Sequence, residues 1–322
     1  MNKIEFIEKL NQWGRERVPF LFMVDFEMEE ALASRMSGID SKQILFDFQG
    51  FTNAGSETFN GNPVLVKNTI SEKDYRKKFD EVMVCLRRGD SFLTNLTIKT
   101  EIQTNVSLRE LFFVARAKYK IFHKSHFLVF SPETFVRIEN DLIYSNPMKG
   151  TIDASLPQAR EMILADQKEF SEHVTIVDLI RNDLSQVADE VAVTKFRYVE
   201  ALKTSDKTLL QVSSEIVGKL QGDYWSRIGE LLSSLLPAGS VSGAPKAKTL
   251  EIIREAEKEK RGYYTGVAGY FDGKQLDSCV MIRFIEQVGE KMYYRSGGGI
   301  TTQSIASKEY QEAIDKVYVP LN

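Results

Sequence analysis

Strand-like segments that follow one another without helices between them constrain the fold of this chain most strongly. Between residues 91 and 151 three runs have the apolar and β-branched composition of strands: "SFLTNLTIKTEI", "KSHFLVFSPETFVRIEND" and "LIYSNPMKGTI". Elsewhere strands and helices are interspersed, without the regular strand-helix-strand rhythm of a doubly wound sheet. The sequence therefore predicts an α+β fold with large, mostly antiparallel sheets.

Helical periodicity is confined to a few segments. Over residues 157–187 the apolar period becomes helical, which predicts one long amphipathic helix through "QKEFSEHVTIVDLIRNDL". The apolar residues at this spacing are Phe170, Val174, Val177, Ile180 and Leu184. We expect further helices at the N-terminus, over about residues 71–89, after the glycine-rich turn "AGSVSGAPK", and from about Ser307. The segment "SGGGITT" is expected to be a second glycine-rich turn.

Composition excludes several classes of function. The chain has 322 residues, of which 43% are hydrophobic and 27% charged, as in ordinary soluble globular proteins. A net charge of −3, with lysines interspersed among acids, gives no basic face for nucleic acid. No apolar run approaches the length of a membrane span, and the N-terminus does not resemble a signal peptide. Cys85 and Cys279 are far apart and without metal spacing, so we expect buried, reduced thiols in a cytoplasmic protein.

Two pairs of glutamates recur at helical spacing. Glu169 and Glu172 lie three residues apart, as do Glu309 and Glu312, so each pair shares one face of a helix. Such a pair is slightly unfavourable unless a cation lies between its members, although exposed acidic pairs are common. Four carboxylates from two helices would suit Mg²⁺, which binds oxygen ligands and keeps several waters.

The glycine-rich segments do not match nucleotide-binding motifs. Neither has the spacing of a Walker loop or of a dinucleotide fingerprint, so an NTPase has no support. Their backbone N–H groups could approach an anion closely, or they could simply form tight turns. Lys149, in "NPMKGTID", is on local evidence alone a solvated lysine in a turn.

As an ordered set, these segments resemble those of chorismate-utilising enzymes. The chain contains, in the family's order, "PMKGT", "KEFSEH", "VDLIRNDL", "GSVSGAPKAKTLEII", "RGYYTGVAGYF", "MIRF", "SGGGI" and "KEYQEAIDK". The resemblance covers roughly residues 70 to 320. It implies a sandwich of two large antiparallel sheets with flanking helices, and a single chorismate-binding domain over residues 1–322. Within it, residues 71–322 would be the catalytic region, and residues 1–70 a shortened N-terminal part without most of the tryptophan-feedback subdomain.

The residue at position 149 separates activities within this family. Relatives that are anthranilate synthases have alanine there, whereas aminodeoxychorismate synthases have lysine. The resemblance implies that Lys149 adds to C2 of chorismate as the C4 hydroxyl leaves, protonated by Glu133. Ammonia then attacks C4 and gives 4-amino-4-deoxychorismate, on the branch to para-aminobenzoate and folate. The alternatives are anthranilate synthase component I and a non-catalytic chorismate-binding paralogue.

The resemblance also implies a metal site and a substrate site. Glu172 and Glu312 match the principal Mg²⁺ ligands, and Glu169 and Glu309 would support them through water or substrate. Arg283 and Tyr264 match a clamp for the enolpyruvyl carboxylate. The remaining residues with implied substrate contacts are Thr151, Gln211, Ser242, Gly298 and Gly299.

Two positions depart from the family pattern, and the chain offers no nucleophile for a glutaminase reaction. Gln211 replaces a histidine, and glutamine cannot shuttle a proton toward aromatisation. Leu93 replaces the lysine base of water-adding relatives, which disfavours isochorismate and salicylate synthases. Neither cysteine lies in the context of a glutaminase nucleophile. We therefore expect ammonia to come from a glutamine amidotransferase subunit.

Overall fold

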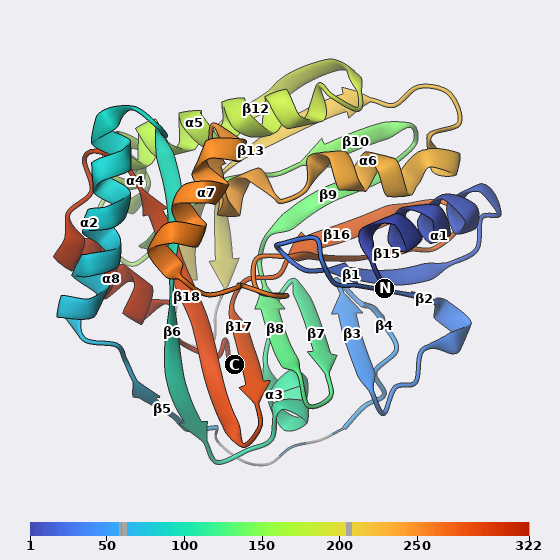
Figure 1. The fold of residues 1–322 in the computed structure, drawn as a ribbon, viewed down its shortest axis with the longest axis horizontal. Helices are drawn as coiled ribbons and strands as arrows, with labels where there is room; N and C mark the ends of the chain where they lie inside the picture. The colour runs from blue at the N-terminus through green and yellow to red at the C-terminus, as the bar shows by residue number, and fades with distance from the viewer. Residues whose placement is uncertain (58, 60–62, 204–207, 322) are drawn as a thin grey trace. The chain divides into compact units, whose positions relative to one another are not determined.

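The computed structural model describes residues 1–57, 59, 63–203 and 208–321 (Figure 1). The chain divides into two compact units, each assembled from segments that are distant in the sequence. The first unit comprises Met1–Gly38, Glu133–Lys246 and Arg261–Val280. The second unit comprises Ile39–Pro132, Ala247–Lys260 and Met281–Asn322. The single chorismate-binding domain stays a prediction.

The first unit is built on one large antiparallel sheet. Its nine described strands run in the order β11-β13-β10-β9-β16-β15-β1-β2, with β12 paired to β13. Their bounds are β1 (Phe20–Val24), β2 (Ala31–Arg35), β9 (Thr134–Glu139), β10 (Leu142–Ser145), β11 (Met148–Asp153), β12 (Asp189–Lys203), β13 (Thr208–Lys219), β15 (Val267–Phe271) and β16 (Leu276–Val280).

The second unit is built on another antiparallel sheet, in the order β6-β18-β17-β8-β7-β3-β4, with β5 paired to β6. Its strands are β3 (Ile44–Phe48), β4 (Phe51–Thr52), β5 (Leu65–Asn68), β6 (Leu93–Thr104), β7 (Tyr119–His123), β8 (Phe127–Ser131), β17 (Phe284–Val288) and β18 (Lys291–Ile300). The predicted α+β fold with two large antiparallel sheets is confirmed. The packing of the two sheets as a sandwich stays a prediction.

Helices cover the sheets within each unit. In the first unit α5 packs on β11, β12 and β13, and α1 packs on α6. In the second unit α2 and α8 pack on each other and on β18. The bounds are α1 (Lys3–Arg15), α2 (Glu72–Arg88), α3 (Leu108–Val114), α4 (Ala159–Ala165), α5 (Gln167–Leu184), α6 (Ile228–Leu235), α7 (Lys246–Glu257) and α8 (Ala306–Asp315). The helices predicted at the N-terminus, near residues 71–89 and from about Ser307 are confirmed.

The long amphipathic helix predicted through "QKEFSEHVTIVDLIRNDL" is confirmed, since α5 spans Gln167–Leu184, and a separate short helix, α4, precedes it. Helix α4 ends and α5 begins at Asp166, whose backbone is extended with ψ 113°. The Asp166 carboxylate accepts a hydrogen bond of 3.0 Å from the backbone N–H of Glu169, so it caps the first turn of α5. Aspartate at this point therefore starts a new helix instead of continuing the old one.

The prediction that "SGGGITT" forms a turn is also wrong. Gly297, Gly298 and Gly299 belong to β18, where they pair with Thr97, Leu96 and Asn95 of β6. Glycine is used here for close approach: a Cβ on Gly297 would lie 2.4 Å from the carbonyl oxygen of Leu96.

The two cysteines lie in the predicted elements but differ in exposure. Cys279 is buried in β16, whereas Cys85 in α2 is only half-buried, so the prediction of two buried thiols is wrong for Cys85. One face of the amphipathic helix α2 points toward the core and the opposite face toward water. Cys85 lies at the margin between the two faces. Among the described residues, no helix combines the length and the apolar character that crossing a membrane requires.

We predict that Gly297→Ala destabilises the protein by about 1–3 kcal/mol, because the added methyl group must push strand β6 away from β18. Gly55→Ala is the control, since no atom lies within 4 Å of the added Cβ there. Urea unfolding followed by circular dichroism would measure both. Equal unfolding midpoints for the two variants would contradict the close packing of these strands.

Candidate active site

Lys149 lies against the acidic face of helix α5. Its ammonium is 2.5 Å from Oε2 of Glu172, whose side chain is only 2% exposed. The Lys168 ammonium lies 3.4 Å from the other oxygen, Oε1, of the same carboxylate. Lys149 itself is 21% exposed, so it is not the solvated turn lysine that local evidence suggested. One buried carboxylate is thus bracketed by two cations.

A bulge in strand β11 brings the chain close to the second glutamate of this helix. The register of β11 on β13 shifts between Lys149 and Thr151, which places the irregularity at Gly150. Gly150 has φ 78°, and a Cβ there would lie 3.3 Å from Oε2 of Glu169. Thr151 lies opposite Gln211, with Thr151 exposed and Gln211 buried. The strand therefore places Lys149 beside Glu172 and Gly150 beside Glu169.

His173 is a buried neighbour of this cluster that our sequence reasoning did not assign. Its Nε2 is 2.7 Å from the hydroxyl of Ser214. Burial, with the nearby cations of Arg197 and Lys149, lowers the pKa of His173 to about 4. The imidazole is therefore neutral at pH 7. The segment "KEFSEH" contained the signal, because it places this histidine directly after Glu172.

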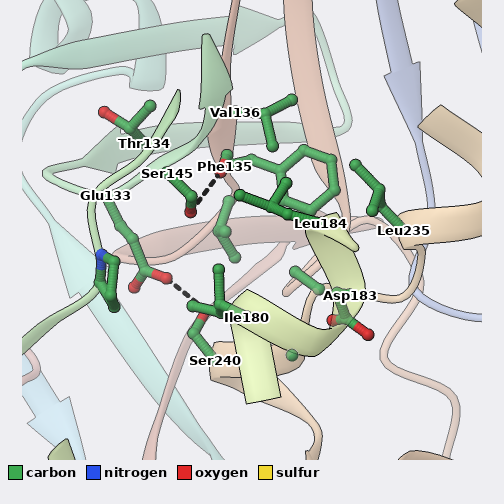
Figure 2. Close-up of a pocket in the computed structure, with 14 residues that line it drawn as sticks. Glu133, Thr134, Phe135, Val136, Ser145, Ile180, Asp183, Leu184, Leu235 and Ser240 are labelled. Atoms are coloured by element: carbon green, nitrogen blue, oxygen red, sulfur yellow. Dashed lines mark hydrogen bonds between the residues drawn. The ribbon is translucent and has the colours of Figure 1, made fainter. Parts of the chain in front are cut away.

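Glu133 and Ser240 meet at one side of a small cavity in the first unit (Figure 2). Glu133 is buried, and the Ser240 hydroxyl donates a hydrogen bond to its Oε1. Apolar side chains, including Ile180 and Leu184 of α5, line much of the cavity. Sequence reasoning assigned Glu133 but missed Ser240, although "AGSVSGAPK" carries it two residues before Ser242.

A buried ion pair lies at the other side of the same cavity. Asp183 lines it, and the Lys246 ammonium lies 2.8 Å from Oδ2 of Asp183. Burial raises the pKa of the Asp183 carboxyl, and the Lys246 ammonium opposes that rise. Lys246 also donates to the carbonyl of Leu235. This pair holds the start of α7 against the end of α5.

Two further predicted substrate contacts of the first unit are deeply buried. Ser242 is 0% exposed, and its hydroxyl donates to the carbonyl of Ala238, 3.0 Å away, inside the glycine-rich turn. Tyr264 is 4% exposed and lies in the turn that follows Arg261. The hydroxyl of Ser242 is thus engaged by the turn itself.

In the second unit, the glycines of β18 face the second pair of glutamates. A Cβ on Gly298 would lie 3.4 Å from Oε1 of Glu312 and 3.9 Å from Oε2 of Glu309. The Lys316 ammonium is 2.6 Å from Oε1 of Glu312 and donates to the Gly297 carbonyl at 2.9 Å. Sequence reasoning missed Lys316, which stands one helical turn after Glu312 in "KEYQEAIDK".

Arg283 also belongs to the second unit, where its backbone is unusual. Its φ is 52°, a value that non-glycine residues rarely adopt and that is often found at functional positions. The guanidinium lies over the ring of Tyr318, 5.0 Å from its centroid.

The predicted site residues thus fall into two sets, one in each unit. The first unit holds Glu133, Lys149, Thr151, Glu169, Glu172, Gln211, Ser242 and Tyr264. The second unit holds Arg283, Gly298, Gly299, Glu309 and Glu312.

The carboxylate pairs of each unit offer oxygen donors of the kind that a hard cation takes. In the described part of the chain, no group of three or more His, Cys, Asp or Glu side chains could hold a metal ion. Oε1 of Glu172 is buried and accepts no hydrogen bond from the described residues. Carboxylate oxygens in pairs suit Mg²⁺, which completes its shell with water and substrate oxygens.

The sequence pattern of one protein family, described as chorismate binding enzyme, matches residues 11–322. This chain belongs to the chorismate binding enzyme family. The expected resemblance is therefore confirmed over nearly the whole chain, including the part before residue 70.

Relatives of this family member differ in their named activities. A protein from Haemophilus influenzae named as an uncharacterized PabA-like protein is 48% identical over 98% of this chain and 96% of its own length. Aminodeoxychorismate synthase component 1 from Salmonella typhimurium is 31% identical over 78% of this chain and 57% of its own length. Anthranilate synthase component 1 from Acetivibrio thermocellus is 32% identical over 79% of this chain and 53% of its own length. The chain thus spans about half the length of these two synthases, and identity alone does not separate their activities.

Solved structures share the fold of this chorismate binding enzyme. Anthranilate synthase component I from Streptococcus pneumoniae matches with a TM-score of 0.68 and 29% identity, covering 79% of this chain and 58% of that one. A putative 2,3-dihydroxybenzoate-specific isochorismate synthase from Bacillus anthracis matches with a TM-score of 0.74 and 18% identity. The match covers 98% of this chain and 87% of that one.

We predict that Lys246→Met destabilises the enzyme by about 3 kcal/mol, because it leaves the buried Asp183 without its cation. A carboxyl whose pKa is raised by folding loses stability as pH rises, so the loss should be larger at pH 8 than at pH 5. Urea unfolding at both pH values would measure it.

Lys248→Met is the matched control, since Lys248 forms an exposed ion pair with Glu251 at 2.6 Å. It should change stability by no more than about 0.5 kcal/mol. Adding Asp183→Asn to Lys246→Met should recover part of the loss. The same loss at both pH values would show that packing, not charge, is responsible.

Proposed function

We propose that this chain is aminodeoxychorismate synthase component I, which converts chorismate and ammonia to 4-amino-4-deoxychorismate. The observation that carries the proposal is the position of Lys149. Its ammonium lies in a half-buried place beside Glu172, within a member of the chorismate binding enzyme family. A lysine that is withdrawn from water and held by neighbouring groups is the kind that serves as a nucleophile.

In this proposal Lys149 forms a covalent bond with the substrate. After losing a proton, the amine adds to C2 of chorismate, both conjugated ring double bonds shift toward C4, and the C4–O bond breaks. Ammonia then adds at C4, both double bonds shift back, and the C2–N bond to Lys149 breaks. The ring thus exchanges its C4 hydroxyl for an amino group, and Lys149 returns to its starting state.

Glu133 would supply the proton that the departing hydroxyl needs in order to leave as water. Its position supports this role, since the side chain is buried at the edge of the cavity and away from bulk water. The hydroxyl of Ser240 donates to Oε1 of Glu133 and so fixes the orientation of the carboxyl group. Ser240 is therefore a positioning residue for the proposed acid.

Magnesium is the metal that the carboxylate pairs would hold. Glu172 and Glu312 are the proposed principal ligands, and Glu169 and Glu309 would act through water or substrate. When bound, the ion would hold the ring carboxylate and offset its charge. The backbone N–H groups of Gly298 and Gly299 would hold the same carboxylate.

Ammonia must come from outside this chain in the proposed reaction. Cys85 lies in helix α2 and Cys279 in the middle of strand β16, and neither position is the exposed strand-to-helix turn of a nucleophile. We therefore propose a glutamine amidotransferase subunit as partner. The product would enter the route to para-aminobenzoate and folate, in the cytoplasm.

Anthranilate synthase component I is the second candidate, favoured by the 32% identical relative with that name. Two residues argue against it. Lys149 stands where such relatives have alanine, and Gln211 stands where they have histidine. Gln211 is buried opposite Thr151, and an amide there cannot carry a proton during aromatisation. A non-catalytic chorismate-binding paralogue would form no aminated product at all.

We predict that Lys149→Ala lowers formation of 4-amino-4-deoxychorismate by at least ~10², the scale on which the loss of a catalytic group is felt. Any remaining ammonia-dependent product should carry the amine at C2, because nothing then occupies that face of the ring. Product analysis by NMR at saturating ammonium, for wild type and variant, would measure both effects. Near-normal 4-amino product from the variant would show that ammonia attacks C4 directly.

We predict that Glu172→Gln and Glu312→Gln each lose most activity and weaken Mg²⁺-dependent binding of chorismate, with little effect on folding. The reason is that the neutral amide of glutamine attracts a divalent cation less strongly than the charged carboxylate does. Calorimetry with and without Mg²⁺ would measure binding, and Glu251→Gln, in an exposed ion pair on α7, is the control. Unchanged Mg²⁺-dependent affinity in both variants would place the metal elsewhere.

A further inference from the structure

Two turns leave the sheet of the first unit at the same end. Strand β1 pairs with β15, and Val24, the last residue of β1, lies opposite Val267, the first residue of β15 (Figure 1). The turn that follows β1, residues 25–30, therefore lies beside the turn that precedes β15, residues 261–266. The second turn contains Tyr264, which the proposed function assigns to the enolpyruvyl carboxylate.

Glu27, in the turn after β1, holds the start of the second turn. Its Oε1 accepts a hydrogen bond of 2.9 Å from the backbone N–H of Arg261. Its Oε2 accepts one of 3.0 Å from the backbone N–H of Gly262. The Gly262 carbonyl in turn accepts a hydrogen bond of 2.8 Å from the N–H of Phe26. Hydrogen bonds to a charged carboxylate are stronger than those between neutral groups, so this contact fixes two successive peptide groups.

The position of Tyr264 follows from that of Arg261. The backbone N–H of Tyr264 donates to the carbonyl oxygen of Arg261, 3.2 Å away, which closes the turn. The Thr265 hydroxyl donates to the Tyr264 carbonyl at 2.6 Å. Because the turn is closed by its own hydrogen bonds, a group that holds Arg261 also holds Tyr264.

The side chain of Arg261 reaches from this turn to the glycine-rich turn. It is 2% exposed, and its guanidinium lies 4.5 Å from the centroid of the Phe26 ring. Its Nη1 donates a hydrogen bond of 2.8 Å to the carbonyl of Val241, the residue before Ser242. Arg261 thus fixes one turn through its backbone and the other through its side chain.

We propose that Glu27 and Arg261 are positioning residues for the binding of chorismate. Glu27 holds Arg261 in place. Arg261 in turn places Tyr264 and Ser242 for contact with the substrate. Neither Glu27 nor Arg261 touches the substrate itself. This inference rests on the substrate contacts in the proposed function, and it gives the N-terminal part of the chain a role in substrate affinity.

Glu27→Gln tests the first step in the full chain. The amide of glutamine keeps one acceptor oxygen and turns the other position into a donor, so one of the two hydrogen bonds is lost. The Kd for chorismate, measured by calorimetry with Mg²⁺ and without ammonium, should rise at least about fivefold, the scale of one lost hydrogen bond. The kcat for chorismate consumption should stay within about twofold of wild type, because the reacting groups are unchanged.

Glu30→Gln is the matched control. It removes the same charge from the same turn, but the Glu30 side chain is exposed. Its Kd for chorismate should stay within about twofold of wild type. A wild-type Kd in Glu27→Gln would overturn the proposal, as would an equal rise in Glu27→Gln and Glu30→Gln, which would assign the effect to charge alone.

A double-mutant cycle tests whether Glu27 acts through Tyr264. Tyr264→Phe removes the hydroxyl that would bind the carboxylate. In that background, Glu27→Gln should raise the Kd by less than about twofold further, because the contact that it positions is already gone. Effects of the two substitutions that simply multiply would overturn this coupling.

Arg261 supplies a separate test. Arg261→Lys keeps a charged donor near the Val241 carbonyl, so it should raise the Kd less than Arg261→Met does. Equal Kd values for the two variants, with both shown to be folded by circular dichroism, would overturn the role of the side chain. None of these readouts depends on the identity of the product. A 2-amino product from the wild-type enzyme, or no product, would therefore refute the proposed function and leave this inference standing.

Discussion

Strand β13 pairs with β12 along its whole length on one edge, and with β11 and then β10 on the other. This pairing holds Lys149 opposite Val212, a residue that is 2% exposed. Helix α5 packs across the same strands, so the register of β11 on β13 decides which residue faces Glu172. A shift by one residue would turn the Lys149 side chain to the other face of the sheet. The candidate site of the first unit depends on this register more than on any single side chain.

The bulge at Gly150 adds a second constraint on the same strand. It lets two successive residues of β11 approach α5, with Lys149 at Glu172 and Gly150 at Glu169. In the second unit, Gly298 of β18 approaches Glu312 and Glu309 of α8 in a comparable way. A Cβ at Gly150 would crowd Glu169 at 3.3 Å, whereas a Cβ at Gly298 would make an ordinary contact with Glu312 at 3.4 Å. Glu172 and Glu309 are buried, whereas the Glu312 side chain is 42% exposed.

Sequence reasoning predicted the elements well and their limits less well. The antiparallel sheets and the helices near residues 71–89 and 307 followed from patterns that extend over many residues. The helix through "QKEFSEHVTIVDLIRNDL" followed from the same kind of pattern, whereas the short helix α4 before Asp166 was not predicted. The glycines of β18 were assigned to a turn because glycine is common in turns. Their place in a strand reflects the close approach of β6 and α8, which involves residues distant in the sequence.

The order and identity of the motif residues by themselves determined the fold class, the family and the choice of Lys149, Glu133 and the four glutamates. Residue identities and the order of motifs are properties of the amino-acid sequence itself, so they can be recognised without a structure. Only the tertiary structure decided that Lys149 is paired with Glu172, Ser240 with Glu133 and Lys316 with Glu312. Two of these contacts join residues that are 23 and 107 positions apart. The third, between Glu312 and Lys316, depends on which rotamer the lysine adopts beside the Gly297 carbonyl. Contacts of this kind arise from packing and charge in three dimensions, and spacing along the chain does not specify them.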